Sequence, residues 1–249
     1  MYFNLNLNVD HFATLRNARG GNEPDPATAA VIAELAGATG IVTHLRKDRR
    51  HINDKDVLKI KDIISTKLNL EMSSDAEIVD FACNLKPAVS TIVPETDNEI
   101  TTEGGLDVVH HIPHLKEVAK KLHDNGIQVS LFIEPDREQI DAALEVKADI
   151  VEFNTKYFAI AFNTHQRDKI SAEISKLYDS CDYSEEQSLY VAAGHSLNYS
   201  NIVEFCNVTN IMEYNIGHSI VARSALVGIN AAVKEMLDVM TRHKVFYCV

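Results

Sequence analysis

The sequence predicts an α/β protein of the (β/α)8 TIM-barrel class, with additional helical or loop segments, folded as a single domain over residues 1–249. Three observations support this prediction. First, short β-like runs alternate with longer amphipathic segments along the chain, which implies parallel strands joined by right-handed crossovers. Second, about eight such units in a chain of this length fit a closed barrel better than an open sheet. Third, no glycine-rich fingerprint follows the first strand, which argues against a dinucleotide-binding fold.

The expected strands are short runs in which residues are apolar throughout or alternate between apolar and polar, as in β-structure. Most of them end in a polar side chain. They lie at residues 5–11, 40–46, 68–73, 88–95, 128–135, 150–155, 188–195 and 212–218.

The expected helices have apolar residues at steps of three and four, which gives each helix one buried face. They include residues 25–38, 54–65, 75–85, 114–126 and 136–148. Helix-capping residues stand at their starts, at Asp25, Asn53, Asp75 and Asp136, and Gly126 is a stop signal. Two connections, 94–113 and 156–169, are longer than needed, and we expect them to be loops near the site.

The overall composition restricts the partners and the compartment. A formal net charge of −12 argues against nucleic acid or an anionic membrane as a partner, although it permits small anionic substrates. No apolar run is long enough for a transmembrane helix, and the start of the chain is read as a strand instead of a signal peptide. The scattered cysteines predict free thiols in a reducing cytoplasm: Cys83, Cys181, Cys206 and Cys248.

Polar residues are concentrated where the predicted strands end. In a parallel barrel these carboxyl ends meet at one mouth, where the chemistry of such folds takes place. One such residue is usually a solvated boundary, but a nearly complete ring of them predicts an active site. The ring comprises Asn8, Asp10, His11, His44, Arg46, Glu71, Glu95, Glu134, Asn154, Thr155, His195, Asn215 and His218.

Glu71 is the strongest candidate for a catalytic residue, because burying a carboxylate inside a short apolar strand costs free energy unless the carboxylate has a partner. Burial would raise its pKa toward the range of a general base. The alternative is a structural salt bridge to a neighbouring strand. His44 has the same place on the preceding strand, so the two residues could form an acid–base pair, with His195 approaching from across the mouth.

Two further clusters have competing interpretations. The basic stretch "HLRKDRRH", with Arg19 after the first strand, could place Arg46, Arg49, Arg50 and His51 around a phosphate, or could be a solvated face. His110, His111 and His114 lack matching zinc ligands at suitable spacing, so we expect a surface patch there.

The tripeptide Gly-His-Ser occurs twice, at 194–196 and 217–219. It resembles a hydrolase nucleophile elbow, but the required second glycine is replaced by Asn198 and Val221. The remaining triad members could only be Asp238 and His243, both on one terminal helix. We therefore favour a phosphate site built from backbone N–H groups after the last two strands.

Together, "NVDHFATLRNARGG", "HLRKDRRHI", "LNLEM", "VPE…TTEGGLDV", "GIQVSLFIEPD", "AGHSLNY" and "YNIGHSIVARS" resemble the pyridoxine 5′-phosphate synthase family over essentially the whole chain. The resemblance implies a (β/α)8 barrel that assembles into homo-octamers. It also implies a ring-closing condensing transferase that joins 3-amino-2-oxopropyl phosphate to 1-deoxy-D-xylulose 5-phosphate, releasing phosphate and water. No metal or organic cofactor is implied.

The resemblance also implies residue roles. Its acid–base groups correspond to His44, Glu71 and His195. Its amino-ketone phosphate contacts correspond to Asn8, Arg19, Ser196, Gly217 and His218. Its pentulose phosphate contacts correspond to Asp10, His11, Arg46, His51 and Thr101.

Two positions depart from the family pattern. Ser196 stands where glycine is usual, and Asn154-Thr155-Lys156 stands where His-Thr-Gly is usual. These departures motivate a second hypothesis, a catalytically silent barrel that only binds phosphorylated small molecules.

Overall fold

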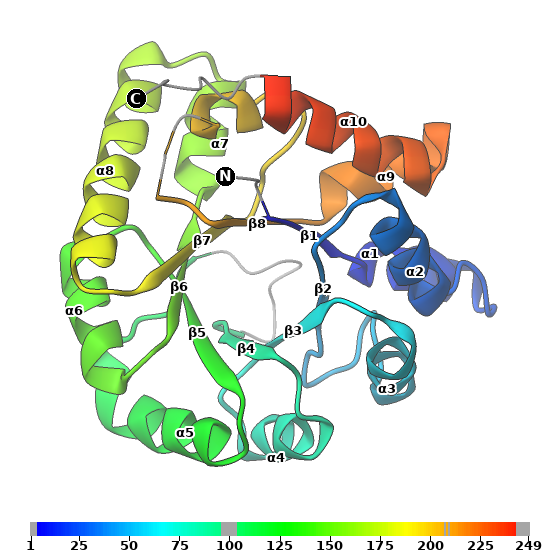
Figure 1. Cartoon of the computed structure of the whole chain (residues 1–249), viewed down its shortest axis with the longest axis horizontal. Coiled ribbons are helices and arrows are strands. Elements are labelled where there is room, and N and C mark those ends of the chain that lie inside the picture. Colours follow the sequence, from blue (N-terminus) through cyan, green and yellow to red (C-terminus); the bar gives the residue numbers. More distant parts are fainter. Residues whose placement is uncertain (1–3, 96–103, 207, 209, 243–249) are drawn as a thin grey trace.

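The computed structural model describes residues 4–95, 104–206, 208 and 210–242 of the chain. Within them, eight parallel strands follow one another around a closed barrel in which β1 also pairs with β8 (Figure 1). The predicted fold class is confirmed. The strands are β1 (Asn4–Asn8), β2 (Gly40–His44), β3 (Lys67–Met72), β4 (Val89–Ile92), β5 (Gln128–Ile133), β6 (Ile150–Asn154), β7 (Tyr190–Gly194) and β8 (Glu213–Ile216).

Helices surround the strands (Figure 1). They are α1 (Asp10–Arg19), α2 (Pro26–Ala36), α3 (Asp54–Ile63), α4 (Ala76–Leu85), α5 (Ile112–Asp124), α6 (Arg137–Val146), α7 (Lys156–Asn163), α8 (Arg167–Glu186), α9 (His218–Val227) and α10 (Ile229–Arg242). Two 3-10 turns, η1 (Val109–His111) and η2 (Ile202–Phe205), complete the elements. Within the described residues, no helix is both long and apolar enough to cross a membrane.

The predicted helix starts agree closely with the structure. Asn53 forms a capping box with Asp56, and Asp25 and Asp136 accept hydrogen bonds from backbone N–H groups of the first helical turn. Asp75 occupies the cap position of α4 but its side chain makes no capping bond; it accepts from the Ser73 hydroxyl instead. Helix α5 ends at Asp124, two residues before Gly126.

The prediction of a loop at 156–169 is wrong. Helix α7 fills most of it, and α8 begins at Arg167. The physical reason is the apolar spacing of Phe158, Ala159 and Ala161, whose burial stabilises an extra helix. In the other expected loop, 96–103 lie outside the described residues, while 109–111 form η1 and α5 begins at Ile112.

Strand alternation separates an apolar wall from a polar barrel interior. Leu5 and Leu7 of β1 are fully buried in the hydrophobic core, whereas Asn6 between them hydrogen bonds with side chains of β8. Asn6 donates to Glu213 (2.5 Å) and to Asn215 (3.0 Å), and Lys67 forms an ion pair with Glu213. Burying a polar group without a hydrogen-bond partner costs about 2–7 kcal/mol, and these contacts avoid that cost for the polar side chains inside the barrel.

Candidate active site

A cavity of about 570 Å³ lies at the carboxyl ends of the strands. It brings together nearly all of the residues to which the resemblance assigned roles. Those that line it are Asn8, Asp10, His11, His44, Arg46, His51, Glu71, His195, Ser196, Gly217 and His218. Arg19 is exposed at the end of α1 and is not among the lining residues, and Thr101 lies outside the described residues.

His44 and Glu71 lie side by side, because the register of β2 and β3 pairs them directly. His44 Nδ1 is 4.0 Å from Glu71 Oε2. Burial raises the pKa of Glu71 well above its usual value, and the negative charges of Glu152 and Asp10 raise it further. This shift favours the protonated carboxyl, so Glu71 is suited to exchanging a proton with His44 or a bound intermediate.

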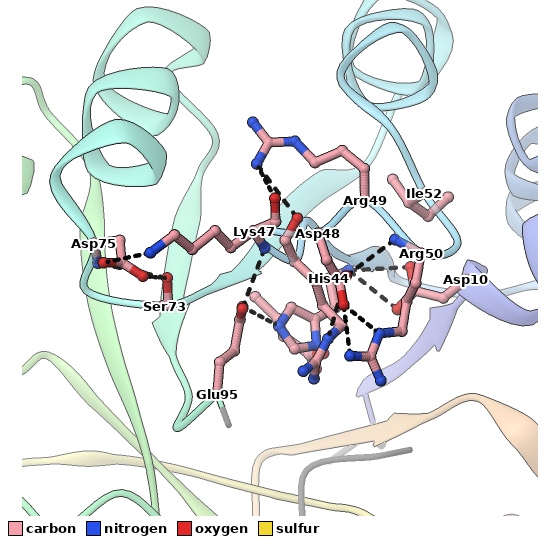
Figure 2. Close-up of polar contacts among 12 residues, drawn as sticks. Asp10, His44, Lys47, Asp48, Arg49, Arg50, Ile52, Ser73, Asp75 and Glu95 are labelled. Atoms are coloured by element: carbon pink, nitrogen blue, oxygen red, sulfur yellow. Dashed lines mark hydrogen bonds and ion pairs between the residues drawn. The ribbon is translucent and has the colours of Figure 1, made fainter. Parts of the chain in front are cut away.

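Figure 2 shows how the His44 imidazole and backbone are held from opposite sides. The ring Nε2 forms a hydrogen bond with Glu95 Oε1 at 2.8 Å, while the backbone N–H donates to both carboxylate oxygens of Asp10 at 3.0 and 3.1 Å. Burial raises the pKa of Asp10 to about 6 against the opposing effect of the His44 charge. The histidine thus has little freedom to change its orientation.

Three histidines at the mouth are kept neutral. Burial lowers the pKa of His195 to about 4, and the nearby charge of Lys156 lowers it further. Burial lowers the pKa of His51 to about 3, with contributions from the charges of His44 and His11. Burial also lowers the pKa of His11, whose ring meets His218 edge-on at 5.2 Å between centroids. At neutral pH these imidazoles can accept protons or hydrogen bonds.

Glu152 lines the cavity and was not among the sequence candidates. It lies within β6, fully inside the barrel, where its Oε2 accepts from Asn215 at 2.7 Å. Burial raises its pKa to about 8, and the charge of Glu213 adds to the effect. The same signal that identified Glu71, a carboxylate inside an apolar strand, is present in "IVEFNT" and could have identified it.

This raised pKa leads to a prediction about stability. An unfolded glutamate ionises near pH 4.5 and Glu152 near pH 8, so the folded state binds more protons in that window and loses stability as the pH rises through it. Glu152→Gln keeps the acceptor for Asn215 and is expected to flatten this loss between pH 6 and 8. Urea unfolding at several pH values measures it; a slope equal to that of the native protein would contradict the prediction.

The two Gly-His-Ser turns differ in structure. Gly217 is the N-cap of α9 without a side-chain capping bond, and a methyl group there would lie 2.9 Å from Asn8 Cβ, so glycine allows the close approach. In the first turn, His195 and Ser196 both have left-handed backbone conformations, with φ of 71° and 64°. Ser196 thus adopts the conformation that glycine would favour.

The nucleophile-elbow alternative finds no support in these contacts. The Ser219 hydroxyl donates to the Leu197 carbonyl at 2.8 Å. Asp238 forms an exposed ion pair with Arg242, and His243 lies outside the described residues. No triad geometry is present among the described residues.

The basic stretch after β2 divides into two parts. Arg46 and His51 line the cavity. Arg49 pairs with Asp54 and Glu77, and Arg50 with Asp48, so these two arginines do not ring the mouth as the sequence suggested. His110 and His114 are exposed and bond to Asp107 and Ser74. The described residues contain no group of His, Cys, Asp or Glu side chains able to hold a metal ion.

Comparisons with known proteins agree with this geometry. A family model described as pyridoxal phosphate biosynthesis protein PdxJ matches residues 5–242. Curated relatives named pyridoxine 5′-phosphate synthase include one from Chlorobium phaeobacteroides, 47% identical and covering 94% of this chain and 98% of its own. Another, from Geotalea daltonii, is 48% identical and covers 95% of this chain and 98% of its own.

Solved structures support the fold alone, because their sequences are distant. KGPDC from Streptococcus mutans has a TM-score of 0.65 at 11% identity, covering 97% of this chain and 99% of its own. Thiamine phosphate pyrophosphorylase from Pyrococcus furiosus has a TM-score of 0.60 at 12% identity, covering 97% and 96%.

Proposed function

This chain belongs to the PdxJ family of pyridoxal phosphate biosynthesis proteins, and from that premise we propose how its residues divide the work of the family reaction. It is an enzyme that forms pyridoxine 5′-phosphate by condensing 3-amino-2-oxopropyl phosphate with 1-deoxy-D-xylulose 5-phosphate. The observation that carries this function is the family match over 5–242. The cavity at the strand ends supplies the residues for the proposed roles.

We propose two anion-binding regions in the cavity. The amino-ketone phosphate lies at the start of α9, against Gly217 and His218, where the uncapped first turn directs N–H groups and a positive dipole outward. Asn8 and Ser196 line the same region, and Arg19 completes the proposed set. The pentulose phosphate lies near the nearly buried Arg46, with Asp10, His11, His51 and Thr101 as the other proposed contacts.

The proposed catalytic groups are His44, Glu71 and His195. Imine formation, enolisation, loss of water and ring closure each move a proton on or off one bound intermediate. Burial raises the pKa of Glu71 and raises that of Glu152 to about 8, so both carboxyl groups favour the protonated form and can donate protons from the cavity floor. His44 and His195 can accept protons from two sides, and burial lowers the pKa of His195 to about 4. The site therefore holds proton donors and acceptors at the same pH.

The direct test mixes the purified protein with both substrates and follows the absorbance of pyridoxine 5′-phosphate. Product formation supports the family reaction. Absence of product, with thermal stabilisation by each substrate retained, would instead favour a catalytically silent barrel that binds phosphorylated molecules. Crystals soaked in phosphate should show density at Gly217 and His218 if the first anion region is placed correctly.

The departure at Ser196 yields a further prediction. Because Ser196 already has a left-handed φ, Ser196→Gly keeps the turn while relieving about 1–2 kcal/mol of backbone strain. Glycine also adds about 0.4–1 kcal/mol of unfolded-state entropy, which opposes the gain. We expect the unfolding free energy to rise by about 0–1.6 kcal/mol and kcat to change less than twofold. Steady-state kinetics and urea unfolding measure both, and a tenfold rise in kcat would show that the serine side chain obstructs the site.

We also propose that the enzyme works in the cytoplasm as a homo-octamer of single-domain subunits. The family resemblance supports this assembly. Light scattering coupled to size-exclusion chromatography tests it, and a monomer at working concentrations would contradict it.

A further inference from the structure

We propose that Glu95 is a positioning residue that holds His44 in the tautomer protonated on Nε2, so that Nδ1 accepts protons on the side of Glu71. The expected effect of Glu95 on kcat rests on the proposed function. The assignment of the His44 tautomer does not depend on it. Glu95 has no role among those implied by the family resemblance, and it is not among the residues that line the cavity. It acts on the reaction through His44.

The contact is buried and anchored at both ends. The His44 and Glu95 side chains are 8% and 9% exposed, with Nε2 and Oε1 2.8 Å apart. The second carboxylate oxygen, Oε2, accepts from the Lys47 backbone N–H at 3.2 Å, and Lys47 itself pairs with Asp75 (Figure 2). One carboxylate therefore fixes both the imidazole and the loop that leaves β2.

This link joins strands that are not neighbours. Glu95 follows β4 and His44 ends β2, while β3 lies between them and carries Glu71. His44 is consequently held between two carboxyl groups, one at each ring nitrogen: Glu95 at 2.8 Å from Nε2 and Glu71 at 4.0 Å from Nδ1. The distances are unequal, so the two carboxyl groups have different roles.

The chemistry of the two carboxyl groups decides which nitrogen carries the proton. Burial opposes ionisation of Glu95, but the hydrogen bond and charge of His44 outweigh it and lower the pKa of this carboxyl. An ionised carboxylate only accepts hydrogen bonds, so Nε2 is the donor both in the imidazolium and in the imidazole that remains when Nδ1 gives up its proton. On the opposite side of the ring, burial and the charges of Glu152 and Asp10 raise the pKa of Glu71, which favours its protonated form.

Nδ1 then has its lone pair directed toward the reacting groups. When it accepts a proton, the imidazolium is stabilised by the Glu95 charge, as expected of a carboxylate that orients a catalytic histidine. The other titratable or charged groups around His44 are Asp10 at its backbone N–H, Arg46 on the same loop, and His51 at 6.0 Å between ring centroids. Only Glu95 bonds to the ring within hydrogen-bond distance among the described residues.

The first test needs no variant and no turnover. ¹⁵N chemical shifts of the His44 ring in the native protein should show Nε2 protonated and Nδ1 unprotonated near neutral pH. The opposite tautomer would overturn the proposal. Because this measurement is independent of product formation, it separates failure of the tautomer assignment from failure of the proposed function.

The second test removes the charge and keeps the shape. Glu95→Gln should lower kcat by about 10- to 100-fold, with KM for each substrate changed less than threefold. It should also move the acidic limb of the kcat–pH profile to lower pH, because the imidazolium loses its counter-ion. The glutamine amide can donate to Nε2, so the ¹⁵N spectrum should shift toward the Nδ1-protonated tautomer.

Two companion variants make the result decisive. Glu95→Asp retains the charge and should keep the native tautomer and recover part of kcat, which a packing role would not predict. Glu77→Gln, which removes an exposed carboxylate paired with Arg49 of the same loop, is the matched control and should change neither kcat nor the spectrum. Native kcat, pH profile and tautomer in Glu95→Gln would overturn the proposal.

Discussion

Replacing Glu71 by glutamine is expected to lower kcat by about 10²- to 10⁴-fold while leaving substrate affinity nearly unchanged. Glutamine has the size of a protonated glutamate and can accept the hydrogen bond from Asn8, but it cannot exchange a proton with His44 or the substrate. Because burial raises the pKa of Glu71 and so favours its neutral form, a neutral glutamine suits the same buried position. The loss should therefore appear in kcat and not in KM or stability.

Single-turnover kinetics with both substrates measures the chemical step, and thermal shifts with each substrate measure binding. Glu145→Gln, an exposed carboxylate on α6 that pairs with Lys116, is the control for a generic loss of charge and should behave as the native protein. Near-native turnover in Glu71→Gln would remove Glu71 from proton transfer and leave the structural salt-bridge interpretation.

The second large effect is expected for Gly194→Ala, which should lower the unfolding free energy by about 1–3 kcal/mol and reduce kcat. Gly194 ends β7 opposite Asn154, and a methyl group at this glycine would overlap the Glu152 carboxylate and lie 3.2 Å from the Asn215 carbonyl oxygen. The strand cannot move away, because its backbone is paired with both neighbouring strands. The carboxylate must therefore be displaced from the cavity floor.

A double-mutant cycle assigns the cause of this effect. Glu152→Ala should cost less in the Gly194→Ala background than in the native protein, because the clash has already displaced the carboxylate. Gly21→Ala is the control: no atom lies within 4 Å of an added methyl group there. Urea unfolding measures all of the variants, and strictly additive free energies would show that the two side chains do not interact.

Prediction from the sequence succeeded where a local pattern has a fixed structural consequence. Alternation of strand and helix patterns implies a parallel barrel, and the carboxyl ends of its strands converge at one mouth. The sequence therefore places His44, Glu71, His195 and His218 at one mouth, and all four line the cavity. Resemblance to a known family, carried by motifs along the whole chain, then named the reaction.

Prediction failed where the outcome depends on competition between partners. Arg49 and Arg50 follow Arg46 directly in the sequence, yet nearby carboxylates pair with both and only Arg46 lines the cavity. The segment 156–169 contains polar residues at its end and resembled a loop, but its apolar positions are buried as α7. Neither result follows from residue types alone, because each is set by which neighbours lie within reach in the folded chain.

The sequence by itself determined the barrel, the polar ring of strand ends and the family. Only the tertiary structure decided the protonation states and the contacts across the barrel: Glu152 with Asn215 on the floor, and Glu95 with His44 over the intervening strand. The reason is that periodicity is a local property of the chain, whereas desolvation and side-chain distance are properties of the closed barrel. The two Gly-His-Ser turns illustrate this difference between sequence and structure. Their shared sequence predicted two adjacent strand ends. The backbone geometry decided that one turn begins α9 and that the other holds His195 and Ser196 in left-handed conformations.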